Sequence, residues 1–140
     1  MRLLLDTNVL SEVTKPRPAE GVLNWLHNLD EDRTFISIVS IAEISRGVAL
    51  MESGRKREAL DEWLKHDLPQ RFDNRTIPVE GSVALAWGDL MAFAKRNGRG
   101  LASMDGLIAA TAIAHDLTLA TRNIKDFEDF GINIIDPWAV

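Results

Sequence analysis

The segment Leu3-Leu4-Leu5-Asp6-Thr7-Asn8 is a short apolar run that stops abruptly at three polar residues. An apolar run of this length, bounded by turn-forming residues, predicts a buried strand of a parallel sheet. Ligands of such sheets bind beyond the carboxyl ends of the strands. The sequence therefore places Asp6 where a functional site is expected.

Strands and helices alternate along the rest of the chain. Apolar runs predict further strands at residues 34–37, 75–79, 117–120 and 132–135, and Pro78 favours an edge or strand-end position for its strand. Helical spacing predicts helices at residues 6–14, 41–54, 55–67, 80–97 and 103–115. Another helix is predicted with Pro18 in its first turn and its apolar positions at residues 22–29. This alternation predicts an α/β fold, a three-layer sandwich in which a central parallel sheet is flanked by helices.

The composition fits an ordinary globular protein. The 140 residues predict a single domain over residues 1–140, and apolar and charged residues make up 46% and 26% of the chain. The absence of cysteine excludes disulfides and thiolate metal sites, and the N-terminus begins with a strand instead of a signal sequence. No apolar stretch approaches the roughly 20 residues needed to cross a bilayer. We therefore expect a cytoplasmic protein without a membrane span.

The net charge of −5 argues mildly against a nucleic-acid partner, because contact with phosphates usually needs a basic surface. The basic residues are clustered, however, in three groups: Arg46 with residues 55–57, Arg71 with Arg75, and Lys95 with Arg96 and Arg99. Solvated helix surfaces and charges at helix C-termini are the better explanation for any one group. Only a position around a cleft would make them a binding track.

Two further acids, Glu43 and Asp105, follow predicted strands or loops at the starts of helices. Each acid also has a purely structural explanation. Asp6 can cap a helix, Ser40 and Glu43 fit a capping box, and Asp105 can complement the positive end of its helix. An α/β fold nevertheless brings strand ends and helix starts to one rim, so a shared site is the better explanation for all three.

A cluster of carboxylates needs a cation or a proton to offset the repulsion between its charges. A hard divalent cation meets this need. Mg²⁺ accepts oxygen ligands while it keeps several waters, and Mn²⁺ suits the same ligands. We therefore predict a Mg²⁺ or Mn²⁺ site at Asp6, Glu43 and Asp105.

Other polar residues are expected at the same rim. Thr121 and Asn123 end the strand at residues 117–120, and Asp126 follows one helical turn later. Asn123 can supply a neutral carbonyl or hold a water, whereas Asp126 can supply charge if its turn points inward or can simply occupy a helix N-terminus. Thr7 and Asn8 can orient Asp6 or the waters of the metal, although turn formation explains both equally well.

Other catalytic arrangements are absent from the sequence. The three histidines have no zinc-ligand spacing, and there is neither a Gly-x-Ser-x-Gly segment nor a phosphate-binding glycine loop. The tryptophans at positions 25, 63 and 87 lie on apolar helix faces, which favours packing over base stacking.

Four segments, in order, carry a resemblance to a known family. They are Leu4–Glu12 (LLDTNVLSE), Ser40–Ile44 (SIAEI) with Gly47-Val48, Asp105–Ala112 (DGLIAATA), and Leu119–Asn123 (LATRN) with Asp126-Phe127 and Pro137-Trp138. Together they resemble the PIN-domain family and, within it, the VapC and FitB-like toxins of bacterial toxin–antitoxin pairs. The match runs along the whole chain.

The resemblance implies a PIN-like, Rossmann-like fold and an enzyme that cleaves RNA with Mg²⁺ or Mn²⁺. By this resemblance Asp6, Glu43 and Asp105 are the catalytic and metal-binding residues. Many FitB-like members have a fourth acid at the position of Asn123, so either Asp126 substitutes for it here or three acids suffice. The resemblance also implies a homodimer, a separate antitoxin that neutralises the enzyme in a hetero-oligomer, and contact with operator DNA only through that antitoxin.

The expected reaction is metal-assisted hydrolysis of RNA phosphodiester bonds. Two alternatives remain open. An aspartate that ends a first strand can be a nucleophile in phosphotransfer, but haloacid-dehalogenase-like enzymes favour Asp-x-Asp there and residue 8 is asparagine. The missing acid at position 123 also leaves room for a catalytically weak PIN-like module that binds RNA or protein.

Overall fold

The computed structural model describes residues 1–140 and contains a five-stranded sheet. Its strands are β1 (Leu3–Leu5), β2 (Thr34–Ser37), β3 (Thr76–Ile77), β4 (Thr118–Ala120) and β5 (Ile134–Ile135). They are ordered β3-β2-β1-β4-β5, and every neighbouring pair is parallel. The first strand is therefore central, and the predicted position of the 75–79 strand at an edge is confirmed.

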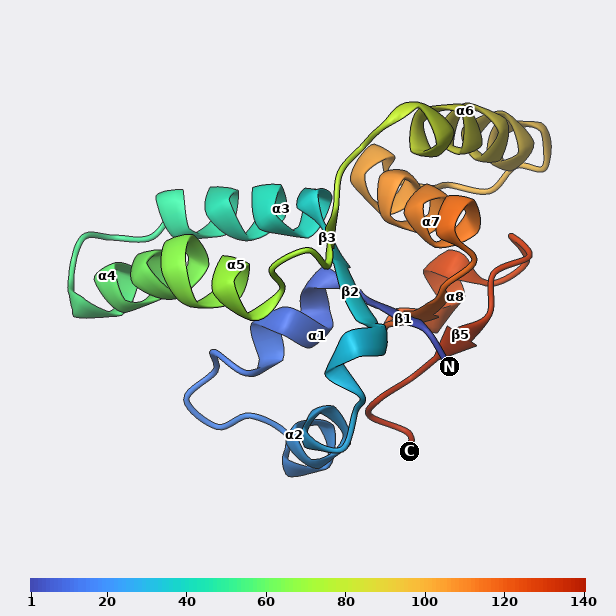
Figure 1. Cartoon of the computed structure of the whole chain (residues 1–140). Coiled ribbons are helices and arrows are strands. Elements are labelled where there is room, and N and C mark those ends of the chain that lie inside the picture. Colours follow the sequence, from blue (N-terminus) through green and yellow to red (C-terminus); the bar gives the residue numbers. More distant parts are fainter.

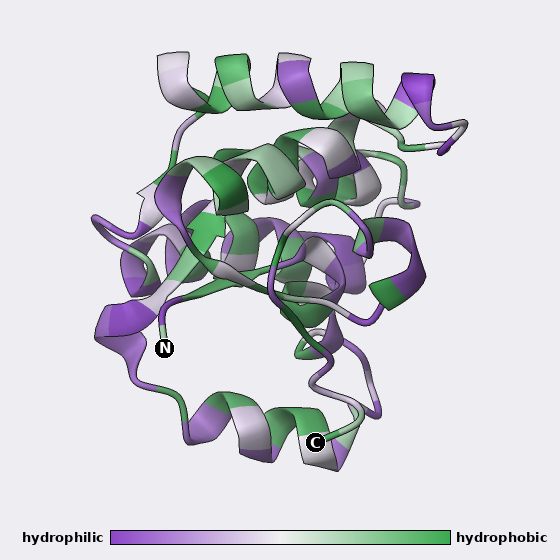
Figure 2. Ribbon diagram, turned by 90° about the vertical axis from the view of Figure 1, so that its right-hand side faces the viewer, coloured by the Kyte–Doolittle hydropathy of each residue, from purple (hydrophilic) through white to green (hydrophobic).

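Helices cover both faces of this sheet. They are α1 (Thr7–Glu12), α2 (Glu20–His27), α3 (Ile38–Ala49), α4 (Arg55–Glu62), α5 (Leu68–Arg71), α6 (Gly81–Arg96), α7 (Ser103–His115) and α8 (Ile124–Phe127). Figure 1 shows α1, α3, α4 and α5 on one side of the sheet and α6, α7 and α8 on the other, with α6 outermost. Helices α2 and α6 lie at opposite ends of the molecule (Figures 1 and 2). The predicted α/β architecture is confirmed.

Two apolar cores, one on each face of the sheet, follow from the alternation of side chains along the strands. Leu4 and Leu119 pack with residues of α6, α7 and α8, whereas Leu5, Ile36 and Ala120 pack with residues of α1, α4–α5 and the connecting turns. All five residues are fully or almost fully buried. Burial on both faces explains why the strands are continuous apolar runs. None of the helices is long and apolar enough to span a membrane.

The segment before α2 differs from the sequence prediction. Helix α2 begins at Glu20 with Ala19 as its N-cap, so Pro18 lies outside the first turn where we expected it. The buried carboxylate of Glu12 accepts a hydrogen bond from the Ala19 N–H at 2.8 Å and pairs with Lys15, also at 2.8 Å. These two contacts hold the connection between α1 and α2 against the end of α1. Helix α2 therefore begins later than predicted.

The helix predicted at residues 55–67 is longer and irregular. It continues to Arg71 as α4, a π-helical segment η2 (Trp63–Asp67) and α5. Pro69 lies in the first turn of α5, where its missing N–H is tolerated. The apolar spacing predicted the helix, but it contained no signal for the wider π turn that begins at Trp63.

Close packing of α6 on α7 depends on Gly106. A Cβ atom at this position would lie 2.6 Å from Met91 Sδ and 3.1 Å from Trp87 Nε1, both on α6. The Trp87 indole N–H also donates a hydrogen bond to the carbonyl oxygen of Ser103 at 3.2 Å. Helix α6 therefore positions the first turn of α7, the turn that carries Asp105.

This packing predicts opposite effects for two glycine substitutions. Gly88 on α6 has open space around its Cα, so Gly88→Ala should raise the free energy of unfolding by about 0.5–1 kcal/mol through helix propensity. Gly106→Ala should lower it, because overpacking costs about 1–3 kcal/mol. Urea denaturation of both variants measures the difference. Equal effects would contradict the close approach of α6 and α7.

Candidate active site

Asp6 lies at the carboxyl end of the central strand and is the N-cap of α1. Its Oδ1 accepts a hydrogen bond from the Thr7 N–H at 2.7 Å, so the capping role considered from the sequence is real. However, only 3% of the residue is exposed, and a helix cap does not require such complete burial. A second set of contacts holds the other carboxylate oxygen.

Thr121 and Asn8 surround Oδ2 of Asp6. The Thr121 hydroxyl donates to this oxygen at 2.8 Å and accepts the backbone N–H of Asn123 at 3.0 Å. The Asn8 amide lies 3.4 Å from Oδ2 and 3.3 Å from the Thr121 hydroxyl, while its carbonyl oxygen accepts the Arg122 N–H at 3.3 Å. The ends of β1 and β4 are therefore linked by side chains at the point where the strand order reverses, which is the usual ligand site of such sheets.

Glu43 lies inside α3 and not at its start. The N-cap of α3 is Ser37, whose hydroxyl accepts the Val39 N–H at 3.0 Å, so the capping box predicted for Ser40 and Glu43 is wrong. Glu43 is instead held by the Thr7 hydroxyl, which donates to its Oε1 at 2.7 Å and lies 2.8 Å from the Ser40 hydroxyl. Glu43 therefore has no helix-capping role.

Asp105 lies in the first turn of α7, after the N-cap Ala102. Its side chain makes no capping hydrogen bond and is partly buried. The position still favours a negative charge, as the sequence indicated, because it is near the positive end of the helix dipole.

The charges of the predicted acids act on neighbouring acids: Glu43 and Asp105 act on Asp6, and Glu43 acts on Asp105. Burial raises the pKa of Asp6 to about 6, against the lowering effect of its hydrogen bonds from Thr121 and Thr7, and the charges of Asp105 and Glu43 raise it further. Burial also raises the pKa of Asp105, to which the charges of Glu43 and Asp126 contribute. The fold therefore brings Asp6, Glu43 and Asp105 together from three separate elements.

Asp126, and not Asn123, supplies a fourth charge to this site. Asp126 is exposed on α8 and close enough to Asp105 to raise its pKa. Asn123 is the N-cap residue of α8 but makes no side-chain capping bond, and its contribution within the protein is the backbone N–H given to Thr121. Of the two alternatives left open by the sequence, the geometry favours Asp126.

The donor set suits a hydrated divalent cation. No group of three or more Asp, Glu, His or Cys side chains lies close enough in this structure to enclose a metal ion. The arrangement fits an ion that takes one or two carboxylates directly and keeps several waters, as Mg²⁺ does. A buried carboxylate among like charges, with its pKa raised to about 6, is also a group that a cation would stabilise.

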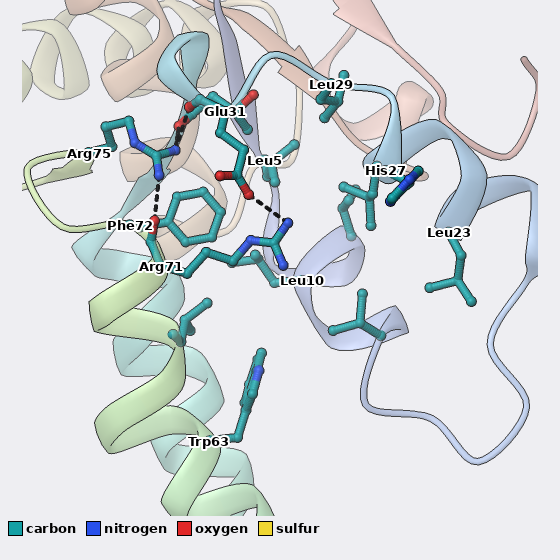
Figure 3. Close-up of a pocket in the computed structure, with 15 residues that line it drawn as sticks. Leu5, Leu10, Leu23, His27, Leu29, Glu31, Trp63, Arg71, Phe72 and Arg75 are labelled. Carbon is teal, nitrogen blue, oxygen red and sulfur yellow. Dashed lines mark hydrogen bonds and ion pairs between the residues drawn. The ribbon is translucent and has the colours of Figure 1, made fainter.

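The structure contains two notable hollows, of which only the smaller is lined by residues of this site. The larger, of about 840 Å³, is an apolar groove between α1–α2 and α4–α5 that contains Leu10, Leu23, Leu26 and Trp63 (Figure 3). At one end Arg71 pairs with Glu31 at 2.9 Å, and Arg75 donates to the Thr34 carbonyl oxygen at 2.7 Å. This basic pair therefore borders a cleft, which the sequence alone could not establish.

The smaller hollow, of about 500 Å³, lies between α1, α3 and the α4–η2 run. Its wall includes Thr7 and Glu43 of the acidic site and, farther along the chain, Met51 and Trp63. Trp63 therefore borders both hollows. The sequence did not indicate either one.

Several known proteins are similar to this chain in sequence and fold. The family model of the PIN domain matches residues 3–133, and the chain therefore belongs to the PIN-domain family. It is 38% identical to Toxin FitB of Neisseria gonorrhoeae over 136 residues, which are 97% of this chain and 98% of that protein. It is 36% identical to a VapC ribonuclease of Sinorhizobium fredii, over 97% of each chain. The crystal structure of FitAcB from Neisseria gonorrhoeae superposes with a TM-score of 0.92 at 38% identity and covers 99% of both chains. The resemblance seen in the four sequence segments is confirmed.

The raised pKa of Asp6 predicts a pH-dependent cost in the metal-free protein. The folded state binds this proton more tightly than the unfolded state, so the contribution of Asp6 to stability falls as pH rises from 3.8 through about 6. Asparagine is an equally good N-cap. Between about pH 4 and about pH 7, the free energy of unfolding should therefore shift in favour of Asp6→Asn by up to about 3 kcal/mol relative to wild type.

Thermal or urea unfolding in EDTA measures this shift. Added Mg²⁺ or Mn²⁺ should stabilise the wild type more than the variant, because the ion binds the folded state through the carboxylate. A difference between variant and wild type that is the same at both pH values would contradict the raised pKa.

Proposed function

We propose that this protein is the toxin of a type II toxin–antitoxin system, a Mg²⁺-dependent ribonuclease that hydrolyses RNA phosphodiester bonds and is neutralised by a cognate antitoxin. The observation that carries this proposal is the buried carboxylate of Asp6 at the carboxyl edge of the sheet, on which the charges of Glu43 and Asp105 act, with Asp126 close to Asp105. The names of the related FitB toxin and VapC ribonuclease support it. We also propose that it acts in the cytoplasm.

Asp6, Glu43 and Asp105 would hold Mg²⁺, or Mn²⁺ in its place. When bound, the ion supplies charge stabilisation at the phosphate oxygens and lowers the pKa of a water. The chain's own residues prepare this site. Thr7 and Thr121 orient the two oxygens of Asp6, and Thr7 also fixes Glu43. The exposed carboxylate of Asp126 is free to orient the attacking water or accept its proton.

The two alternative functions have less support. Both oxygens of Asp6 accept hydrogen bonds inside the protein, which makes this carboxylate a poor nucleophile for phosphotransfer. The binding-module alternative rested on the missing acid at position 123, and Asp126 supplies a charge to the same site. Asp126 thus weakens the argument for lost catalysis.

We propose that the antitoxin binds in the apolar groove. Ten of its fifteen lining residues are hydrophobic, and it is bordered by Arg71 and Arg75 (Figure 3). Such a groove fits the apolar face of an amphipathic helix. Solved FitAB and VapBC complexes among the related structures are bound to DNA, which supports contact with operator DNA through the antitoxin in a hetero-oligomer. We also propose that the toxin forms a homodimer.

The carboxylates provide the direct test of catalysis. Asp6→Asn and Asp105→Asn should each lower RNA cleavage by about 100-fold or more, because each removes charge that the cation requires. Asp126→Asn should cause a smaller loss, and Asn123→Asp should restore part of it in the double variant. Initial rates on a fluorescent RNA, with Mg²⁺ and with EDTA, measure these effects. The Glu128→Gln variant, which changes an exposed carboxylate outside the site, is the control.

Full activity of folded Asp6→Asn and Asp105→Asn would overturn the ribonuclease proposal. So would cleavage by the wild type that persists in EDTA.

The groove predicts a separation of inhibition from catalysis. Leu23→Glu and Leu26→Glu place charges in its apolar wall and should weaken antitoxin binding by about 10-fold or more. RNA cleavage without antitoxin should stay at the wild-type rate, because neither residue touches the acids. Leu85→Glu on α6, where the side chain is already 76% exposed, is the matched control. Titration of the protein encoded by the neighbouring open reading frame into the cleavage assay measures binding, and unchanged inhibition of both variants would place the antitoxin elsewhere.

A further inference from the structure

The smaller hollow combines two kinds of surface. Thr7, Ser11 and Thr14 contribute hydroxyl groups from α1 and the turn after it, and the Thr14 hydroxyl is held by donation to the Ser11 carbonyl oxygen at 2.8 Å. The opposite side is apolar and is formed by Ile44, Val48, Met51, Leu60 and Trp63. A flat ring with a polar edge suits such a hollow better than a purely apolar side chain does.

Trp63 has an unusual position for a packing residue. It begins the π-helical segment η2 in the middle of a continuous helical run, and single π turns are frequent at functional sites. Trp63 is only partly buried and borders both hollows, although the sequence favoured packing over base stacking for it. Figure 3 shows its ring at one end of the apolar groove. The indole therefore has a surface that the core does not cover.

Charge varies along the walls of the smaller hollow in a way that suits a nucleic-acid strand. Thr7 and Glu43, which line it, belong to the proposed metal site, where the scissile phosphate would bind. The Arg57 guanidinium lies outside the wall but donates to the backbone carbonyl oxygen of the wall residue Met51 at 3.3 Å, which brings a cation close to the hollow. Aromatic surfaces beside cations are the usual means of binding single strands.

We propose that this hollow is a nucleobase subsite for single-stranded RNA. It takes the base of one nucleotide next to the scissile phosphate, stacked on Trp63, with the edge of the base facing the hydroxyls of Ser11 and Thr14. The adjoining phosphate lies toward Arg57. The subsite rests on the proposed ribonuclease function, and it gives the enzyme a preference for one base beside the cut.

The test is a coupling experiment between Trp63 and a single base. Binding of short RNAs is measured by fluorescence anisotropy for two proteins. One carries Asp105→Asn alone, and the other carries Asp105→Asn together with Trp63→Leu. Each RNA carries either a normal nucleotide or an abasic one at the positions flanking the cleavage site. Trp63→Leu should weaken binding of the normal RNA by about 5- to 100-fold. Removal of the base at one flanking position should cause the same loss, and the two changes together should cost no more than either alone.

Matched variants separate stacking from folding. Trp63→Phe should recover most of the binding, because it keeps an aromatic face, and Trp25→Leu, which replaces a tryptophan outside both hollows, should bind RNA as tightly as the parent protein. In the background with intact Asp105, Trp63→Leu should raise KM more than it lowers kcat and should reduce the preference among the four bases at that position.

Additive losses at both flanking positions would overturn the subsite while leaving the ribonuclease proposal intact. Unchanged RNA binding by Trp63→Leu would also overturn it, whatever the variant does to antitoxin binding, because Trp63 also lines the apolar groove proposed for the antitoxin. A wild-type protein that neither binds nor cuts RNA would instead overturn the ribonuclease proposal itself.

Discussion

The hydrogen bond from the Thr121 hydroxyl to the Asp6 carboxylate is the contact on which the site depends. It connects the ends of β4 and β1, the neighbouring strands at which the sheet changes its winding direction. Asp6 then starts α1, and Thr7 in that first turn holds Glu43 on α3. The hydroxyl groups of Thr121 and Thr7 thus link the end of β4, the start of α1 and α3. Each hydroxyl is neutral, so the orientation of the acids is obtained without a basic residue that would compete with a cation.

Burial of Asp6 disfavours the charged carboxylate that binding of a cation would require. A buried carboxylate that is close to Asp105 and Glu43 resists ionisation, as its pKa of about 6 indicates. Asparagine there would keep the helix cap without a buried charge. The buried Glu12 provides the contrast within the same helix, because its pKa is lowered by hydrogen bonds from Lys15 and the Ala19 N–H. Both acids accept hydrogen bonds within the protein, but only Glu12 has a cation beside it, whereas Asp6 faces further negative charge.

The sequence predicted the elements and the three principal acids because both depend on local patterns. Apolar runs and helical spacing mark the strands and helices, and parallel strands place Asp6, Glu43 and Asp105 at one edge. It indicated Ser40 as a cap of α3, whereas Ser37, three residues earlier, takes that role, and it could not decide between Asn123 and Asp126, since the answer depends on the direction of a single helical turn. The contact of Trp87 with Gly106 and the exposure of Trp63 depend on distant parts of the chain, so no local pattern signals them.

The order of the strands also determines when this site can form during synthesis. Asp6 and Thr121 are 115 residues apart, and β1 acquires its second neighbour only when β4 has been made. A ribosome-bound chain that ends before β4 has an incomplete central sheet and an unsupported Asp6, and it also lacks Asp126. The support of Asp6 by Thr121, and the charge of Asp126 beside Asp105, therefore exist only after almost the whole chain has been translated.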